Sequence, residues 1–203
     1  MKKISSLTYL LFAALVFTGC SKKDDEPKPT GTLNGTYQFV SMYLKAKTEQ
    51  SFVEAGVTNR TVSDIEYTTT ENTGMMIIEG NTMTSTGLGY KINATMTVES
   101  FTGTTPDFDE PFQVPFNFTV PKYNSTGTFK YVGTDSVLAE KGLIQFPSTG
   151  QEMPVVPNAS KFAIVNGELI FTSVINQSSS EVIQGVRMQK IQTGLAIGRF
   201  RKM

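Results

Sequence analysis

The sequence predicts an all-β fold of antiparallel strands in one domain, residues 33–203. Apolar and polar residues alternate strictly over residues 92–99 and 112–121, which is the period of a strand with one dry face and one wet face. Between two further apolar runs, Asn166-Gly167 supplies the two positive-φ positions of a type I′ hairpin turn. The domain is also rich in threonine, a β-branched residue that favours pleated structure.

The first element, residues 1–19, has the pattern of a secretory signal peptide. Lys2 and Lys3 form a positive start, and residues 4–17 are a mostly apolar run of 14 residues. A helix of that length rises only about 21 Å, which is short of the roughly 30 Å hydrocarbon core of a bilayer. The run ends in Phe17-Thr18-Gly19-Cys20, which resembles the lipobox of bacterial lipoproteins.

Cys20 is the one cysteine of the chain, so an intramolecular disulfide is excluded. The lipoprotein resemblance implies that the leader is cut before Cys20 and that acyl chains, palmitate among them, are attached to this residue. Because stable anchoring takes two chains or more, these groups would hold the protein on a membrane without a spanning segment. The alternative is an ordinary secretory leader followed by an incidental cysteine.

Residues 20–32 are expected to form a flexible tether behind the acylated cysteine. The segment has no large apolar side chain, so burial cannot offset the entropy lost on ordering it. Its Lys22-Lys23-Asp24-Asp25-Glu26 cluster resembles the acidic signal of Bacteroidota lipoproteins, which implies the outer membrane and its cell-surface face. A lipoprotein that faces the periplasm is the alternative.

The domain that follows is expected to contain about 8–11 short strands, arranged as an antiparallel barrel or sandwich. Pro115 cannot donate to a ladder, so its strand should lie at an edge or carry a bulge. Segment 181–192 fits a helix or a strand, and Gly185 favours the strand. Further strands are expected at residues 35–45, 52–58, 61–69, 74–79, 81–86, 126–133, 137–146, 161–165, 168–172 and 194–202.

The two ends of the domain resemble lipocalin-like (calycin) domains of small lipoproteins. The opening Leu33-Asn34-Gly35-Thr36-Tyr37 is similar to their Leu-x-Gly-x-Trp start, with Tyr37 in place of Trp, and the last strand ends in the basic run Gly198-Arg199-Phe200-Arg201-Lys202. The resemblance implies a β-barrel in which Tyr37 packs beneath a cation of the last strand. A β-sandwich is the structural alternative.

An eight-stranded barrel either fills its interior with side chains or holds one small ligand. A hollow interior predicts a binding module for a small hydrophobic or amphipathic ligand, and a packed one predicts a structural lipoprotein that docks a membrane or envelope protein partner. On the first strand, Tyr37, Phe39 and Tyr43 are expected to share one face. The candidate lining residues are Tyr37, Phe39, Tyr43, Met96, Phe116 and Phe118.

The sequence offers no pattern for catalysis, a cofactor or a nucleic acid. It has no His, which excludes Ser-His-Asp and Cys-His catalysis and the usual zinc sites, and 18 basic residues balance 18 acidic ones. The carboxylates of Asp107, Asp109 and Glu110 could serve a calcium site or a glycosidase pair, but a solvated turn is the simpler interpretation. Asp135-Ser136-Val137 resembles the Bacteroidota acceptor for O-glycosylation, which implies that Ser136 lies on an exposed turn. We therefore expect a protein that is not an enzyme.

Overall fold

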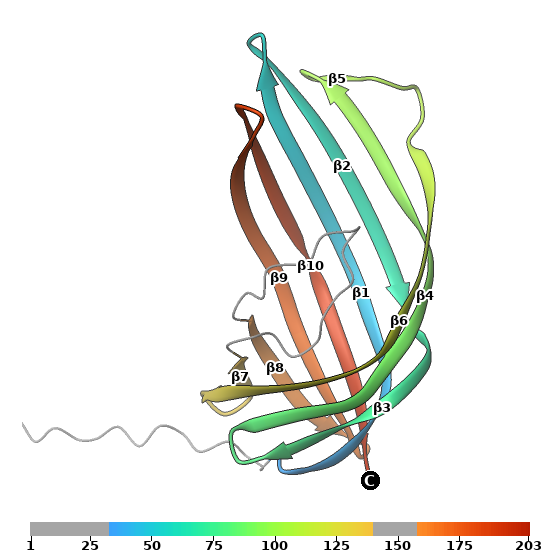
Figure 1. Cartoon of the computed structure of the whole chain (residues 1–203), viewed down its shortest axis with the longest axis vertical. Helices are drawn as coiled ribbons and strands as arrows, with labels where there is room; N and C mark the ends of the chain where they lie inside the picture. The colour runs from blue at the N-terminus through green and yellow to red at the C-terminus, as the bar shows by residue number, and fades with distance from the viewer. Residues whose placement is uncertain (1–32, 140–157) are drawn as a thin grey trace, which may run out of the picture.

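The computed structural model describes residues 33–139 and 158–203, which contain strands and turns and no helix (Figure 1). All strand pairings in these ranges are antiparallel, which confirms the predicted fold class. The signal peptide, Cys20 and the tether lie outside the described residues. The strands are β1 (Gly35–Glu54), β2 (Val57–Thr68), β3 (Thr70–Glu79), β4 (Thr82–Thr102), β5 (Thr105–Pro106), β6 (Phe112–Val132), β7 (Ser136–Ala139), β8 (Asn158–Val165), β9 (Glu168–Ile183) and β10 (Val186–Lys202).

The sheet closes on itself as a barrel-like ring of eight strands. β2 and β3 act as two halves of one strand, because both pair with β1 on one side and with β4 on the other. Apart from the two-residue β5, each strand then pairs with its successor in the sequence, and β10 pairs back to β1. This order is that of an up-and-down antiparallel barrel.

The described strand pairing differs between the two ends of this barrel. Within the described residues, β7 contributes Ser136–Ala139 and β8 contributes Asn158–Val165, and β7 pairs with β6 from Phe129 to Val132. Beyond that region, residues 112–128 of β6 and 174–183 of β9 each have one described neighbour. Pro115 lies in this part of β6, opposite Thr95 of β4.

Two names follow from this difference. The closed end is the one where β1 begins and β10 finishes. The open end is the one with the turns at residues 55–56 and 184–185 and the connection at residues 103–111, which includes β5 (Figure 1).

The half of the barrel next to the closed end has a packed interior. The ring of Phe200 lies 5.4 Å from that of Phe39 and 6.1 Å from that of Phe171, and all three side chains are buried. Leu33 is also fully buried, and its carbonyl oxygen accepts a hydrogen bond of 2.9 Å from the hydroxyl of Tyr37. Side chains therefore fill this half, as they can in an eight-stranded barrel.

Three hairpins share one turn, in which two consecutive residues have positive φ. The φ angles are 49° and 81° at Ala55-Gly56, 51° and 78° at Asn166-Gly167, and 51° and 84° at Gln184-Gly185. Both signs are those of a type I′ turn, so the Asn166-Gly167 prediction is confirmed. The turn at Gln184-Gly185 makes segment 181–192 the end of β9 and the start of β10, whereas the turn at Ala55-Gly56 shows that a strand over 52–58 was wrong.

Gly194 allows β10 to approach β1 closely where the ring closes. A Cβ atom at this position would collide with the carbonyl oxygen of Lys45 and would lie 2.9 Å from the Cα of Ala46. These are backbone atoms of the neighbouring strand, which cannot rotate away as a flexible side chain would. The absence of a side chain at residue 194 is therefore a condition for this pairing.

Candidate binding site on the inner face of β6

The inner face of the sheet is the face that carries the buried core. Residues directly opposite one another in an antiparallel pair point to the same side. Tyr90 and Ile92 of β4 are buried in the core and lie opposite Val120 and Phe118 of β6. Alternate residues of β6 therefore also point inward. We call this set the β6 stripe: Phe112, Val114, Phe116, Phe118 and Val120.

The β6 stripe is apolar but only partly covered. Phe116 and Val120 pack against the core, whereas Phe112 and Phe118 are each 45% exposed and Val114 is 39% exposed. At the open end the ring of Phe112 packs edge-on against that of Phe108, with 4.4 Å between centroids, and Phe108 itself is 53% exposed. Exposed apolar side chains gathered on one face in this way are candidates for an interaction surface.

The inner face is polar on β1, β10 and β9 toward the open end, where β10 pairs with β1 to close the ring. Thr48 of β1 lies opposite Gln192 of β10, which lies opposite Gln177 of β9. One step nearer the open end, Lys190 lies between Gln50 and Ser179. Both rows continue the face of the buried Leu44 and Ala196. The interior toward the open end thus combines an apolar wall on β6 with a polar wall on β1, β10 and β9, a lining suited to a ligand with both kinds of surface.

Tyr67 provides a buried donor beside the middle of the β6 stripe. Its ring stacks on that of Phe116 with 6.4 Å between centroids, and the residue is only 6% exposed. Its hydroxyl has no hydrogen-bond partner in the described part of the chain. Burial raises the pKa of Tyr67, so the hydroxyl keeps its proton at neutral pH. Burial, and then the neighbouring Tyr123 and Tyr67, raise the pKa of Tyr90 in the same way.

The structure divides the six candidate lining residues into three groups. Met96, Phe116 and Phe118 all lie on the inner face of β4 and β6. Tyr37 and Phe39 also point inward, but they are buried in the closed half and belong to its packed core. The sequence analysis did not include Phe112 and Val114, although the alternation that it noted over residues 112–121 already placed them on this face.

The sixth residue, Tyr43, lies on the outer face, so the prediction that it shares a face with Tyr37 and Phe39 was wrong. A β-bulge between Phe39 and Ser41 shifts the register against β10 by one residue. The period of two therefore changes phase, and Met42 takes the buried position. The hydroxyl of Tyr43 instead donates a 2.8 Å hydrogen bond to Oε1 of Glu66.

Tyr37 and Lys202 lie directly opposite one another on β1 and β10, in the region where the lipocalin resemblance implies an aromatic residue beneath a cation. The cation–π contact among the described residues is a different one, with Arg60 Cζ 4.3 Å above the ring of Phe101. The implied contact at Tyr37 therefore stays a prediction.

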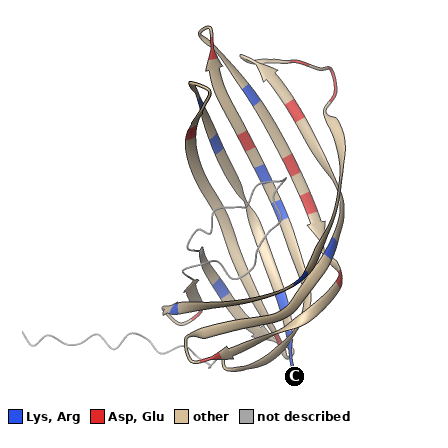
Figure 2. Cartoon of the chain, in the orientation of Figure 1, with Lys and Arg blue, Asp and Glu red and all other residues tan. Residues whose placement is uncertain are grey.

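The outer face of β1 and β2 carries pairs of opposite charges (Figure 2). Lys45 Nζ lies 2.9 Å from Glu66 Oε2, and Arg60 lies 3.7 Å from Glu49. Hydrogen bonds from Lys45 and Tyr43 hold the pKa of Glu66 below its ordinary value. Exposed pairs of this kind contribute little to stability, but they identify a surface that suits water and not hydrocarbon.

The remaining candidates from the sequence lie in or directly beside turns. Asp107, Asp109 and Glu110 lie in the turn region between β5 and β6, where Asp107 accepts a 2.7 Å hydrogen bond from Thr102 Oγ1. Within residues 33–139 and 158–203, no three residues of the types that bind metals are grouped around one point. Ser136 opens β7 directly after a turn, and its hydroxyl donates a 3.0 Å hydrogen bond to Asp135.

Comparisons with known proteins give no family for this chain. No protein-family model matches it, and no curated protein matches it. Among solved structures, Ail, the attachment invasion locus protein of Yersinia pestis, aligns with 83% of this chain and all of its own, at 9% sequence identity and a TM-score of 0.18. A TM-score this low does not show a shared fold. The described part of the chain also contains no helix long and apolar enough to cross a membrane.

Proposed function

We propose that this chain is a lipid-anchored lipoprotein of the bacterial cell envelope whose barrel binds a small apolar or amphipathic ligand and catalyses no reaction. The observation that carries the proposal is the β6 stripe, in which Phe112, Val114 and Phe118 remain exposed on the inner face of a barrel whose closed half is packed. A ligand that covers these side chains gains the free energy of removing apolar surface from water.

Two further features support a ligand with a polar part. The wall opposite the β6 stripe presents amide and hydroxyl groups and the ammonium group of Lys190. Beside the middle of the stripe, the buried hydroxyl of Tyr67 is a donor without a described partner, and an acceptor atom of a ligand would remove the cost of leaving it unpaired. The up-and-down order of eight strands is that of lipocalin barrels, which hold small ligands.

The anchor rests on the sequence alone. Acyl chains on Cys20, followed by the tether, would place the domain at the outer membrane, facing the cell surface. The charged outer face of β1 and β2 supports a domain that stands in water beside the membrane. Metabolic labelling with a clickable palmitate analogue tests this part: we expect incorporation in the wild type and none in Cys20→Ser. Equal labelling of the two proteins would refute the anchor.

Ligand binding is tested with two probes on the detergent-solubilised full-length protein. N-phenyl-1-naphthylamine is neutral, dansylundecanoic acid is an anionic amphiphile, and both fluoresce more strongly in apolar surroundings. We expect saturable binding of at least one probe and a rise in the melting temperature that increases with probe concentration. Absence of both effects for both probes would contradict the proposal.

The second candidate is an interaction protein, and it is favoured by the parts of β6 and β9 that have one neighbour among the described strands. A strand edge that is unpaired can accept a strand from another chain. Chemical crosslinking in intact cells, followed by purification of the protein, tests this function. Recovery of the monomer alone would count against it, whereas a crosslink to residues 174–183 would support it over ligand binding.

A further inference from the structure

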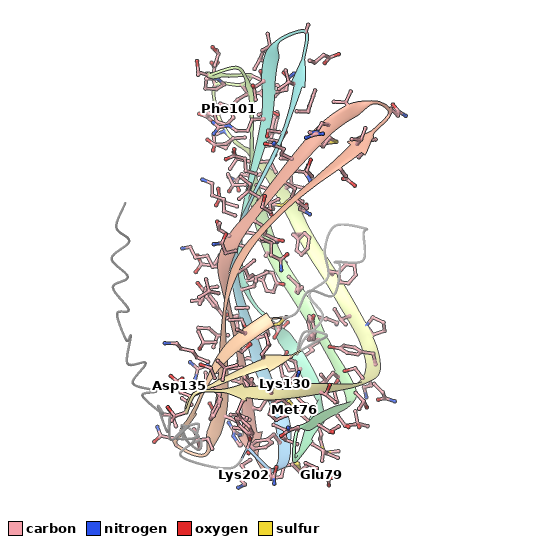
Figure 3. All side chains as sticks on the ribbon, turned by 90° about the vertical axis from the view of Figure 1, so that its left-hand side faces the viewer. Met76, Glu79, Phe101, Lys130, Asp135 and Lys202 are labelled. Atoms are coloured by element: carbon pink, nitrogen blue, oxygen red, sulfur yellow. The ribbon has the colours of Figure 1, made fainter. Side chains whose placement is uncertain are left out.

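The start of the described chain and the open end lie at opposite ends of the barrel. The described chain starts at Leu33, which is buried at the closed end beside the start of β1. Lys202 and Glu79 lie at this same end, whereas Phe101 lies at the far one (Figure 3). The exposed pair Phe108 and Phe112 belongs to the open end, next to the β5 segment that pairs with Phe101.

The distance between the two ends exceeds what the tether can span. β1 has 20 residues and is therefore about 66 Å long at roughly 3.3 Å per residue. At a strand tilt of about 40°, this length corresponds to about 50 Å along the barrel axis. The 13 residues from Cys20 to Thr32 reach about 45 Å when fully extended, and about 20 Å as a relaxed chain. A relaxed tether therefore falls about 30 Å short of the open end, and even a fully extended one does not reach it, which disfavours an orientation with the open end on the membrane that holds Cys20.

We infer that the open end faces away from the anchoring membrane, so that the β6 stripe takes its ligand from the surrounding aqueous phase and not from the lipid leaflet beneath the protein. This inference rests on the lipid anchor and ligand site proposed above. The occupant is an amphiphile that reaches the protein dispersed in water or carried by another molecule. Its polar part faces Lys190 and the amide groups, and its apolar part lies on Phe112 and Phe118.

The charges around the open end support the same orientation. Asp107, Asp109 and Glu110 are exposed beside Phe108, and residues 103–111 contain no basic side chain. An aromatic tip that inserts into a bilayer is usually accompanied by Lys or Arg, because anionic headgroups attract them and repel carboxylates. This tip is therefore better suited to an apolar molecule in solution than to a membrane surface.

The orientation is measured by energy transfer to the membrane. A dye is attached to a new cysteine at the open end (Thr104→Cys) or at the closed end (Asn81→Cys), both in exposed turns. Acylation occupies the native cysteine, so each label is unique. In vesicles of phosphatidylcholine with a headgroup-labelled acceptor lipid, we expect several-fold stronger quenching at residue 81 than at residue 104. Equal or stronger quenching at residue 104 would overturn the inference and leave ligand binding intact.

A longer tether provides the matched control. Insertion of a second copy of residues 21–32 nearly doubles the reach, to about 85 Å, which exceeds the length of the barrel. We expect quenching at residue 104 to rise in this variant, while the label at residue 81 changes little. If the wild-type protein fails to float with the vesicles, the anchor itself is refuted and the orientation falls with it.

The source of the ligand is tested on the same vesicles. Pyrenedecanoic acid supplied in the aqueous phase and a pyrene-labelled phosphatidylcholine built into the anchoring vesicle form the two arms. We expect energy transfer between the dye at residue 104 and pyrene only in the aqueous arm, and loss of this signal in a Phe112→Ser, Phe118→Ser double variant. A signal from the vesicle-bound lipid would overturn the inference.

Discussion

Replacing Phe112 and Phe118 by Ser tests the binding face directly. Each side chain is 45% exposed, and a phenylalanine has about 200 Å² of accessible surface, so about 90 Å² of each remains in water. At about 25 cal/mol per Å², complete covering of both residues by a ligand would contribute about 4.5 kcal/mol. If the ligand covers half of this area, the double variant loses about 2 kcal/mol of binding free energy, which raises the dissociation constant about 30-fold.

The matched control uses the same strand. Gln113 and Thr119 of β6 point outward, opposite Thr97 and Lys91, so a Gln113→Ser, Thr119→Ser double variant carries the same number of substitutions on the other face. Fluorescence titration with N-phenyl-1-naphthylamine should give a wild-type dissociation constant for this control. Thermal melts by circular dichroism show whether both variants are folded at the temperature of the titration.

Val114→Thr gives an independent result even if the double phenylalanine variant unfolds. This substitution preserves β-branching and volume while it adds a hydroxyl to a side chain that is 39% exposed. We expect the dissociation constant to rise three- to tenfold. A change of less than twofold in both inward-facing variants, with melting curves like that of the wild type, would refute the reasoning.

Three further predictions concern stability. Gly194→Ala places a methyl group against the backbone of Lys45 and should lower the free energy of unfolding by about 3 kcal/mol in urea titrations, whereas Gly127→Ala, which meets nothing within 4 Å, should change it little. Tyr67→Phe removes an unpaired buried hydroxyl and should raise the free energy of unfolding by up to about 1 kcal/mol; a loss would mean that the hydroxyl has a partner. Burial raises the pKa of Tyr67 and Tyr90 above the value of about 10 in the unfolded chain. Their contribution to the free energy of unfolding is therefore fully present below about pH 10 and is lost as the pH rises further. Melting temperatures should therefore fall steeply above pH 10, and less steeply in Tyr67→Phe; equal slopes for the two proteins would contradict this assignment.

Local sequence patterns predicted the strands and most of their faces. The alternation over residues 112–121 is produced by burial on one side of β6, so it could be recognised without the structure. Asn166-Gly167 predicted its hairpin because few residue pairs adopt two positive φ angles easily. The same turn at Ala55-Gly56 and Gln184-Gly185 was missed or left open because Ala and Gln rarely adopt positive φ, and only the pairing of the flanking strands holds them there.

The position of Tyr43 could not be predicted from its own strand. Whether residue 43 points inward depends on the bulge between Phe39 and Ser41, and that bulge is defined against β10, more than 150 positions away in the sequence. A shift of one residue exchanges the two faces of everything that follows. A period of two counted from Tyr37 therefore assigns the wrong face to the residues beyond the bulge.

The partial exposure of the β6 stripe has a similar long-range cause, and it shows why a packed barrel and a ligand site need not exclude one another. The closed half is packed because β7 and β8 complete the ring there and bring Val137, Phe171 and Phe200 together over the same face. Toward the open end, β6 loses its second described neighbour, and identical alternation leaves Phe112 and Phe118 exposed. Within the described residues, the extent of pairing on the second side of β6, and not the hydrophobic pattern, decides where the core ends and the proposed binding face begins. A variant in which a further strand paired with residues 112–128 of β6 would therefore be expected to convert the proposed binding surface into core and to raise stability while it lowered affinity.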